Sequence, residues 1–250
     1  MKKRKLLFVS IQIIAVSISL TVLSCKKDET KPSAGDDGVS SAVFNATKTY
    51  ETMTDQNGNI YKTITIGSQT WMAENLHVTS YRNGDPIPLV TNSANWIALT
   101  TGAYCNYANT TDKDKIATYG SLYNWYTVAD ARNIAPAGWH VPSDAEWTTL
   151  TTYLGGESIV SGIMKEVGTT HWLSPNTNAT NESGFTALPS GYRDYGAGAF
   201  EGLGMDGSWW SSTATGTTGA WFRNLYYQRA NCYRGDGSKK FGVTVRLVKD

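Results

Sequence analysis

The chain opens with a basic start followed by an apolar run. Residues 2–5 are all basic, and residues 6–23 carry no charge and are mostly apolar, up to a serine and then Cys25. A basic start, an apolar core and a small residue before a cleavage point are typical of a secretory signal peptide. The alternative is a single transmembrane anchor, because an apolar run of this length almost spans a bilayer. We favour a signal peptide over residues 1–24, since the run stops at a small residue.

Polar residues dominate the stretch that follows. Residues 26–41 read KKDETKPSAGDDGVSS, with several charges and few apolar side chains. Such a segment buries too little apolar surface to offset the entropy of ordering it. The sequence therefore predicts a disordered tether over residues 25–54 and a folded domain over residues 55–250.

Alternation with a period of two marks the start of the folded part. Residues 60–66 and 69–72 alternate apolar and polar side chains on either side of a Gly-Ser pair, and Asn57-Gly58 supplies an earlier turn. This pattern predicts an opening β-hairpin. Residues 55–59, DQNGN, lack the closing glutamate of an EF-hand loop, so we read them as a turn and not as a calcium site.

Helical spacing first occurs in residues 119–133, YGSLYNWYTVADARN. Leu122, Trp125, Tyr126 and Ala129 fall on one face of a helix. The pattern predicts one amphipathic helix whose aromatic face packs into the core.

A second helix is expected directly after the segment GWHVP. Ser143 stands at an N-cap position and Glu146 lies three residues later, which is the spacing of a capping box. Trp147, Leu150 and Leu154 then mark one apolar face, and a Gly-Gly pair ends the helix. Because Glu146 caps the helix, we read this segment as a helix entry and His140 as a core or supporting residue, not as a general base.

Short strand-like runs separated by glycine-rich turns fill the chain from Gly184 onward. They include GSWWSST, GAWFRNLYYQ, ANCYRGDGSKKFG and VTVRLVKD. These runs predict a terminal antiparallel sheet with a turn at residues 235–237. Strand alternation should send one of Trp209 and Trp210 inward and the other outward. Two helices with antiparallel β-hairpins and long loops define an α+β fold.

Charge argues against a nucleic-acid partner. Residues 1–24 hold four basic and no acidic residues, so their removal from 22 basic and 21 acidic residues leaves 18 against 21, a formal net charge of −3. No basic tract remains in the folded part. All nine tryptophans lie at or after Trp71, which indicates an aromatic-rich domain.

Two cysteines remain besides Cys25. Outside the cytoplasm Cys105 and Cys232 can pair as a disulfide or stay free, and the sequence leaves both alternatives open. The sequence has no Cys-x-x-Cys spacing, so nothing in it indicates a metal site built from cysteines.

The segment around Cys25 resembles a bacterial lipobox. The resemblance implies that the Cys25 thiol is acylated, which anchors the protein in a membrane through several acyl chains. The charged residues 26–29, KKDE, resemble the export tags of Bacteroidota surface lipoproteins. This implies a lipid-anchored protein of the outer membrane, exposed at the cell surface.

Six blocks of the folded part resemble the Fibrobacter succinogenes major paralogous domain. In chain order from about Asp55 to Asp250 they are TIGSQTWMAENL, YGSLYNWY, APAGWHVPSDAEWTTL, NESGFTALPSGYR, WWSST and FGVTVRLVKD. That family is similar to the C-type lectin-like fold, which also underlies the formylglycine-generating enzymes. The resemblance implies this fold and a surface location, and it implies no particular reaction.

Motifs for catalysis and cofactor binding are missing. The sequence has no Gly-x-Ser-x-Gly or His-Glu-x-x-His, and its three histidines are scattered. GLGMDG at residues 202–207 fits Gly-x-Gly-x-x-Gly but leads into a strand-like run instead of a helix, so it is not a phosphate loop. We predict no catalytic residue, no metal ligand and no cofactor.

Aromatic rings and arginines in the late segments are the candidates for ligand binding, because they suit stacking on sugars or contact with a protein partner. The candidates are Tyr192, Arg193, Tyr195, Trp210, Trp221, Arg223, Tyr233 and Arg234. Packing within the core is the competing role, and we favour it for most of them.

Three functions follow as hypotheses. The first is a surface-anchored lipoprotein whose C-type lectin-like domain binds glycan or protein ligands without catalysis. The second is an enzyme of the formylglycine-generating or oxygenase type, which would need a reactive thiol or a metal. The third is a structural envelope protein without a soluble ligand.

Overall fold

A computed structural model describes residues 38–250. The expected signal peptide, Cys25 and the first part of the expected tether lie outside the described residues. Within residues 38–250 no helix is long and apolar enough to cross a bilayer.

Helices and strands both occur, which confirms the α+β class. The strands are β1 Glu51–Thr54, β2 Ile60–Ile66, β3 Gln69–Met72, β4 Tyr104–Cys105, β5 Leu122–Tyr123, β6 Trp139–His140, β7 Ser190–Arg193, β8 Phe200–Leu203, β9 Asp206–Ala214, β10 Gly219–Tyr226, β11 Cys232–Ser238 and β12 Val248–Lys249. The helices are α1 Ser93–Ile97, the 3-10 turn η1 Tyr107–Asn109, α2 Lys113–Tyr119, α3 Trp125–Val128, α4 Asp144–Tyr153 and α5 Val160–Met164.

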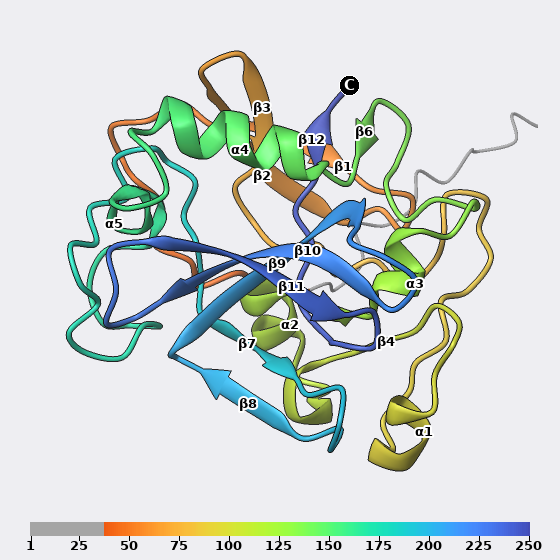
Figure 1. Ribbon diagram of the computed structural model, residues 1–250. Coiled ribbons are helices and arrows are strands. Elements are labelled where there is room, and N and C mark those ends of the chain that lie inside the picture. Colours follow the sequence, from red (N-terminus) through yellow and green to blue (C-terminus); the bar gives the residue numbers. More distant parts are fainter. Residues whose placement is uncertain (1–37) are drawn as a thin grey trace, which may run out of the picture. The chain divides into compact units, whose positions relative to one another are not determined.

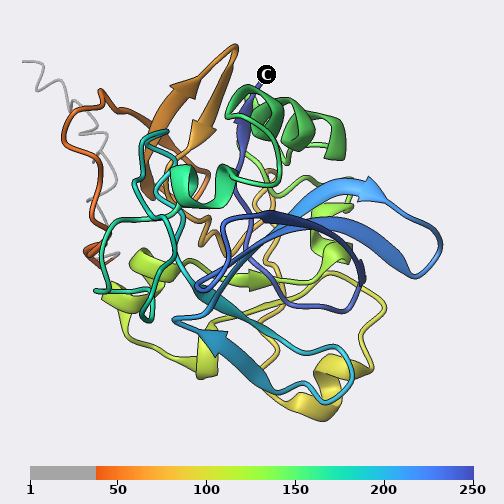
Figure 2. The same ribbon diagram turned by 60° about the vertical axis from the view of Figure 1, so that its left-hand side comes forward.

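A five-stranded antiparallel sheet joins the two ends of the domain, in the order β1-β2-β3-β12-β6. The expected opening hairpin is confirmed as β2 and β3, and Asp55 orders the turn before it by accepting hydrogen bonds from the backbone N–H groups of Asn57 and Asn59. In Figures 1 and 2 the C-terminus lies beside this hairpin and next to α4. The last residues therefore join the first sheet and not the late one, which corrects the expected position of VTVRLVKD.

Residues 242–248 run through the interior and connect the two larger sheets. All seven are buried. Thr244 pairs with Trp209 in β9, and the carbonyl oxygens of Val245 and Leu247 accept from the N–H groups of Leu76 and Met72. Its valines and leucine pack into the two larger core clusters, and the buried Thr244 and Arg246 have hydrogen-bond partners inside the protein.

The late segments form a three-stranded antiparallel sheet in the order β11-β10-β9, which crosses the middle of Figure 1. The turn expected at residues 235–237 is wrong, because these residues lie within β11. Gly235 faces Phe222 across the sheet, and a Cβ there would lie 2.6 Å from that ring. The glycines serve close packing and not chain reversal.

Both tryptophans of WWSST are buried, contrary to the expected alternation. Trp209 belongs to a core cluster under α4, and Trp210 belongs to a second cluster with Tyr123 and Val243. Alternation holds, but β9 has a core on each face, so neither side chain reaches solvent.

The capping box at the start of α4 is confirmed. The Ser143 hydroxyl oxygen accepts from the Glu146 N–H at 3.2 Å, and a Glu146 carboxylate oxygen accepts from the Ser143 N–H at 2.7 Å. Trp147 and Leu150 are fully buried. Because both ends of the box are satisfied, α4 begins at the residue that the sequence predicts.

The single helix expected over residues 119–133 is wrong. Leu122 and Tyr123 form β5, and after Tyr119, the last residue of α2, only the four residues of α3 are helical. Gly120 has a φ of +77°, and a Cβ at this position would lie 2.5 Å from the Asn75 Cβ. Helix α2 therefore ends before Gly120. Asn124 then caps the helical turn α3 by accepting from the Thr127 N–H.

Residues 38–54 are ordered, which corrects the expected extent of the tether. The N–H groups of Val39, Ser41 and Val43 donate to side chains of Asp114, Thr118 and Glu166. Alternate residues of an extended chain point the same way, so one edge of this segment is bonded to the domain. Strand β1 then continues it into the first sheet.

Candidate functional site

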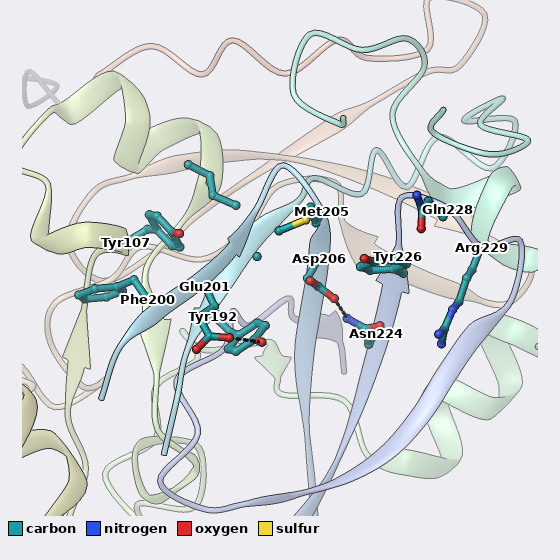
Figure 3. Close-up of a pocket in the computed structure, with 12 residues that line it drawn as sticks. Tyr107, Tyr192, Phe200, Glu201, Met205, Asp206, Asn224, Tyr226, Gln228 and Arg229 are labelled. Carbon is teal, nitrogen blue, oxygen red and sulfur yellow. Dashed lines mark hydrogen bonds between the residues drawn. The ribbon is translucent and has the colours of Figure 1, made fainter. Parts of the chain in front are cut away.

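A groove of about 860 Å³ opens beside the β7–β8 hairpin and the end of the β9–β10 pair. In Figure 3 Tyr107 and Phe200 lie at one end, Gln228 and Arg229 lie at the other, and polar side chains lie between them. Aromatic rings and planar polar groups thus line one continuous surface.

Tyr192 and Glu201 form the first polar pair of the groove. They are direct partners across the β7–β8 hairpin, so their side chains share one face. The Tyr192 hydroxyl donates to a Glu201 carboxylate oxygen at 2.9 Å. Burial raises the pKa of Tyr192, and the Glu201 carboxylate raises it further, so the phenol stays protonated as a donor.

Asp206 and Asn224 form the second pair, at the start of β9 and near the end of β10. The Asn224 side-chain amide donates to Asp206 Oδ1 and to the Ser208 hydroxyl, each at 3.0 Å. Burial raises the pKa of Asp206, although the hydrogen bond from Asn224 opposes this shift. Half-buried groups of this kind present oriented donors and acceptors to a polar ligand.

Gly202 keeps the space between the two pairs open. Its φ is +76°, and a Cβ would lie 2.7 Å from a carboxylate oxygen of Asp206 and 3.1 Å from the Tyr192 ring. The segment GLGMDG, which fails as a phosphate loop, is therefore the turn between β8 and β9 that forms one wall of the groove.

Aromatic groups occupy both ends of the groove. The Tyr107 and Phe200 ring centroids are 5.5 Å apart. At the other end the Arg229 guanidinium lies 5.5 Å from the Tyr226 ring. Flat faces at both ends suit a ligand with apolar faces and polar edges.

Of the eight candidates chosen from the sequence, only Tyr192 lines this groove. Tyr195 and Tyr233 are exposed on nearby loop and strand positions, at 53% and 52%. Trp221 and Arg234 lie on the sheet face that points toward α4, where the Arg234 guanidinium sits 3.5 Å from the Trp221 ring centroid. The structure therefore does not bring the eight together.

Arg193, Trp210 and Arg223 are fully buried, so their expected role in ligand binding is wrong. Arg193 donates to the carbonyl oxygens of Val90, Thr91 and Gly198, and Arg223 donates to Asp144 at 2.7 Å. Their guanidinium groups satisfy buried acceptors, which is the competing core role.

The sequence reasoning missed Glu201, Asp206, Asn224, Tyr226 and Arg229. Asn224 and Tyr226 are two residues apart in a strand, so their shared face was readable from the sequence. Their convergence with Glu201 was not readable, because it depends on how two hairpins pack.

His140 is a supporting residue, as the sequence suggested. Its Nε2 is 2.8 Å from Glu146 Oε1, and its Nδ1 is 2.6 Å from Asp250 Oδ1. Burial alone would lower the pKa of His140, but the hydrogen bonds to Asp250 and Glu146 outweigh it and raise the pKa. The imidazole thus joins the start of α4 to the C-terminus.

Asp144, the other carboxylate of this segment, bonds to arginines. Burial would raise the pKa of Asp144, but hydrogen bonds from Arg234 and Arg223 lower it below its usual range. Asp144 and Glu146 therefore both have structural partners.

Cys105 and Cys232 are both free, which decides the open question about a disulfide. They lie in different core clusters, and burial raises the pKa of each thiol to about 12. Both thiols are therefore protonated at neutral pH and are poor nucleophiles.

Metal-ligating side chains do not gather in the described part of the chain. Within residues 38–250 no group of three or more His, Cys, Asp or Glu side chains is placed to hold a metal ion.

The family model of the Fibrobacter succinogenes major domain matches residues 64–249, and the chain belongs to this family. No curated protein and no solved structure matches the chain significantly. The match ends within one residue of the C-terminus and contains all the residues that line the groove.

Proposed function

We propose that this chain is a surface-anchored lipoprotein whose domain binds glycans in the groove beside β7–β8, without catalysis. The observation that carries the proposal is the combination of aromatic faces with carboxylate and amide groups in one open groove. Sugars have apolar faces and a rim of hydroxyls, so they suit rings on one side and planar polar groups on the other.

A C-type lectin-like fold is part of this proposal. In support, the two ends of the domain meet in one sheet, and long loops occupy residues 73–92 and 165–189. The proposed site uses no bound calcium, because side-chain carboxylates and amides of the groove contact the ligand directly.

The test is a glycan array probed with the full chain and with two variants. Glu201→Ala combined with Asn224→Ala removes one member of each polar pair, and we expect at least a tenfold loss of binding. Glu51→Ala, an exposed carboxylate on β1, is the matched control and should bind as the unchanged chain does. Circular dichroism checks that all three are folded.

Two outcomes would contradict glycan binding. One is an array with no bound glycan, and the other is binding that the paired variant leaves intact. If a pull-down with surface proteins captures a partner through the same groove, the ligand is a protein; if array and pull-down are both empty, a structural envelope role is the better explanation.

Membrane anchoring through acylated Cys25 is proposed from the sequence alone, and with it a position on the outer membrane facing outward. Labelled palmitate should enter the full chain and should not enter Cys25→Ala. Equal labelling of both would refute the anchor.

An enzyme of the formylglycine-generating or oxygenase type is the alternative. The buried, protonated thiols give it no support. A mass-spectrometric survey of thiol state and bound metal in the purified protein separates the two, because a stoichiometric metal or a modified cysteine would favour the enzyme.

A further inference from the structure

A second hollow lies at the β9–β10 turn, at the other end of β10 from the groove. It has a volume of about 430 Å³ and is lined by Tyr195, the β9–β10 turn at residues 215–218, and Asp236. Its wall is made largely of small residues and backbone, which leaves peptide N–H and C=O groups accessible to a polar ligand.

Aromatic rings connect the two hollows. The Phe241 ring lies 5.0 Å from the Tyr192 ring, which lines the groove, and 6.3 Å from the Tyr195 ring, which lines the second hollow. Tyr195 is 53% exposed, and Phe241 is partly buried. The three rings, which are inclined to one another, therefore place apolar surface between the two polar hollows.

The length of β10 sets the distance between the groove and the second hollow. Asn224 and Tyr226 belong to the groove, and Gly219, at the other end of the same strand, belongs to the second hollow. Five to seven residues of strand correspond to about 17–24 Å. A single sugar is much shorter than this distance, whereas a linear oligosaccharide of several units covers it.

Charge restricts the class of ligand. The charged residues that line the two hollows are three carboxylates, Glu201, Asp206 and Asp236, and one guanidinium, Arg229. Three carboxylates against one guanidinium disfavour uronic acids and sulfated sugars, since like charges repel at close range.

From these observations we propose that the groove and the second hollow are the two ends of one site for a linear, neutral oligosaccharide, which crosses Tyr192, Phe241 and Tyr195. The proposal rests on the proposed glycan binding and adds the shape and charge of the ligand. Ligands longer than the groove gain contacts at Tyr195 and in the second hollow, so affinity rises with chain length until the site is filled.

The experiment is calorimetric titration of the full chain in detergent with neutral cello-, xylo- and malto-oligosaccharides, from disaccharide to hexasaccharide, and with oligogalacturonides as the anionic counterpart. We expect at least one neutral series to bind about tenfold or more tightly as hexasaccharide than as disaccharide, and the oligogalacturonides to bind more weakly. Tyr195→Ala should reduce hexasaccharide affinity about tenfold and leave disaccharide affinity unchanged. Tyr153→Ala, which truncates an exposed tyrosine on α4, should change neither.

The outcomes separate this inference from the proposed function. Disaccharide binding without a gain from length, or a gain that Tyr195→Ala does not reduce, overturns the two-ended site and leaves glycan binding in place. Tighter binding of oligogalacturonides overturns the inference that the ligand is neutral. If no oligosaccharide in any series binds, the inference and the proposed glycan function both fail.

Discussion

Arg246 shows how much of this fold depends on a single side chain. It is fully buried, and its guanidinium donates to Asn75 Oδ1 and to the carbonyl oxygens of Phe185 and Thr186 while lying 4.2 Å from the Phe185 ring. Asn75 also accepts from the Trp209 indole N–H. One arginine thus satisfies acceptors from two separate segments around the core under α4.

Replacing Arg246 should therefore cost much more than replacing an arginine at the surface. Arg246→Met leaves buried carbonyl oxygens without donors, and we expect a loss of about 3 kcal/mol in the free energy of unfolding. Arg132→Met, which removes an exposed pair with Asp130, should cost much less. Urea unfolding of both variants measures the difference, and equal costs would contradict the assigned role.

The binding candidates also show that the type of a residue does not by itself reveal its role. Aromatic and arginine side chains line the proposed groove, namely Tyr107, Tyr192, Tyr226 and Arg229. Arg193 and Arg223 have the same chemistry but lie in the core. Residue type cannot separate the two cases, because burial depends on what packs above each side chain.

Among the elements, α4 is the one that the sequence predicts most closely. Its start depends on contacts three residues apart, which are local in the chain. Ser143→Ala should lower the free energy of unfolding by about 1 kcal/mol. Thr149→Ala, at an exposed position in the same helix, is the control and should change stability little, because alanine is a good helix former. A cost for Thr149→Ala as large as that for Ser143→Ala would speak against the cap.

The His140 imidazole beside α4 makes the free energy of unfolding depend on pH. Because the pKa of His140 is raised in the folded state, its contribution is full below its unfolded pKa of about 6.5 and is lost as pH rises through the folded value. The stability difference between the unchanged protein and His140→Gln should therefore shrink between pH 5 and pH 9. Urea midpoints at several pH values measure it, and a constant difference would show that the hydrogen bonds to Glu146 and Asp250 do not favour the charged imidazole.

The two elements that the sequence predicts wrongly have nonlocal causes. The expected helix over residues 119–133 fails at Gly120, which has a positive φ and where Asn75, far away in the chain, leaves no room for a Cβ. The strand-like VTVRLV joins two sheets, because Thr244 pairs with Trp209 in the edge strand β9 and Val248 pairs between β3 and β6. Periodicity describes which faces are apolar, and it does not say which partner covers them.

For the molecule as a whole, residues 38–54 are part of the folded domain. The Val43 N–H donates to the fully buried Glu166, whose other carboxylate oxygen is 2.7 Å from His171 Nδ1, and His171 Nε2 is 3.0 Å from the Ser41 hydroxyl. This chain of contacts anchors the segment where it enters the domain.

Removing one donor from this anchor should destabilise the whole domain. Val43→Pro deletes the N–H that Glu166 accepts from, and we expect a loss of about 2 kcal/mol in the free energy of unfolding. Val43→Ala keeps the N–H, and the Val43 side chain is 47% exposed, so it should cost little. Thermal unfolding distinguishes them, and equal melting temperatures would mean that the segment adds no stability. A chain that starts at residue 55 should melt lower than one that starts at residue 38, because it also lacks β1.

The sequence by itself determined the local features of this protein: the opening hairpin, the capping box at Ser143 and Glu146, the α+β class and the family. Each depends on residues a few positions apart, or on blocks whose order is visible in one dimension. Only the tertiary structure decided that Trp209 and Trp210 are both buried, that Cys105 and Cys232 lie in different cores, and that Tyr192, Glu201, Asp206 and Asn224 share a groove. Those outcomes depend on which faces of distant segments meet, and that is set by packing and not by spacing along the chain.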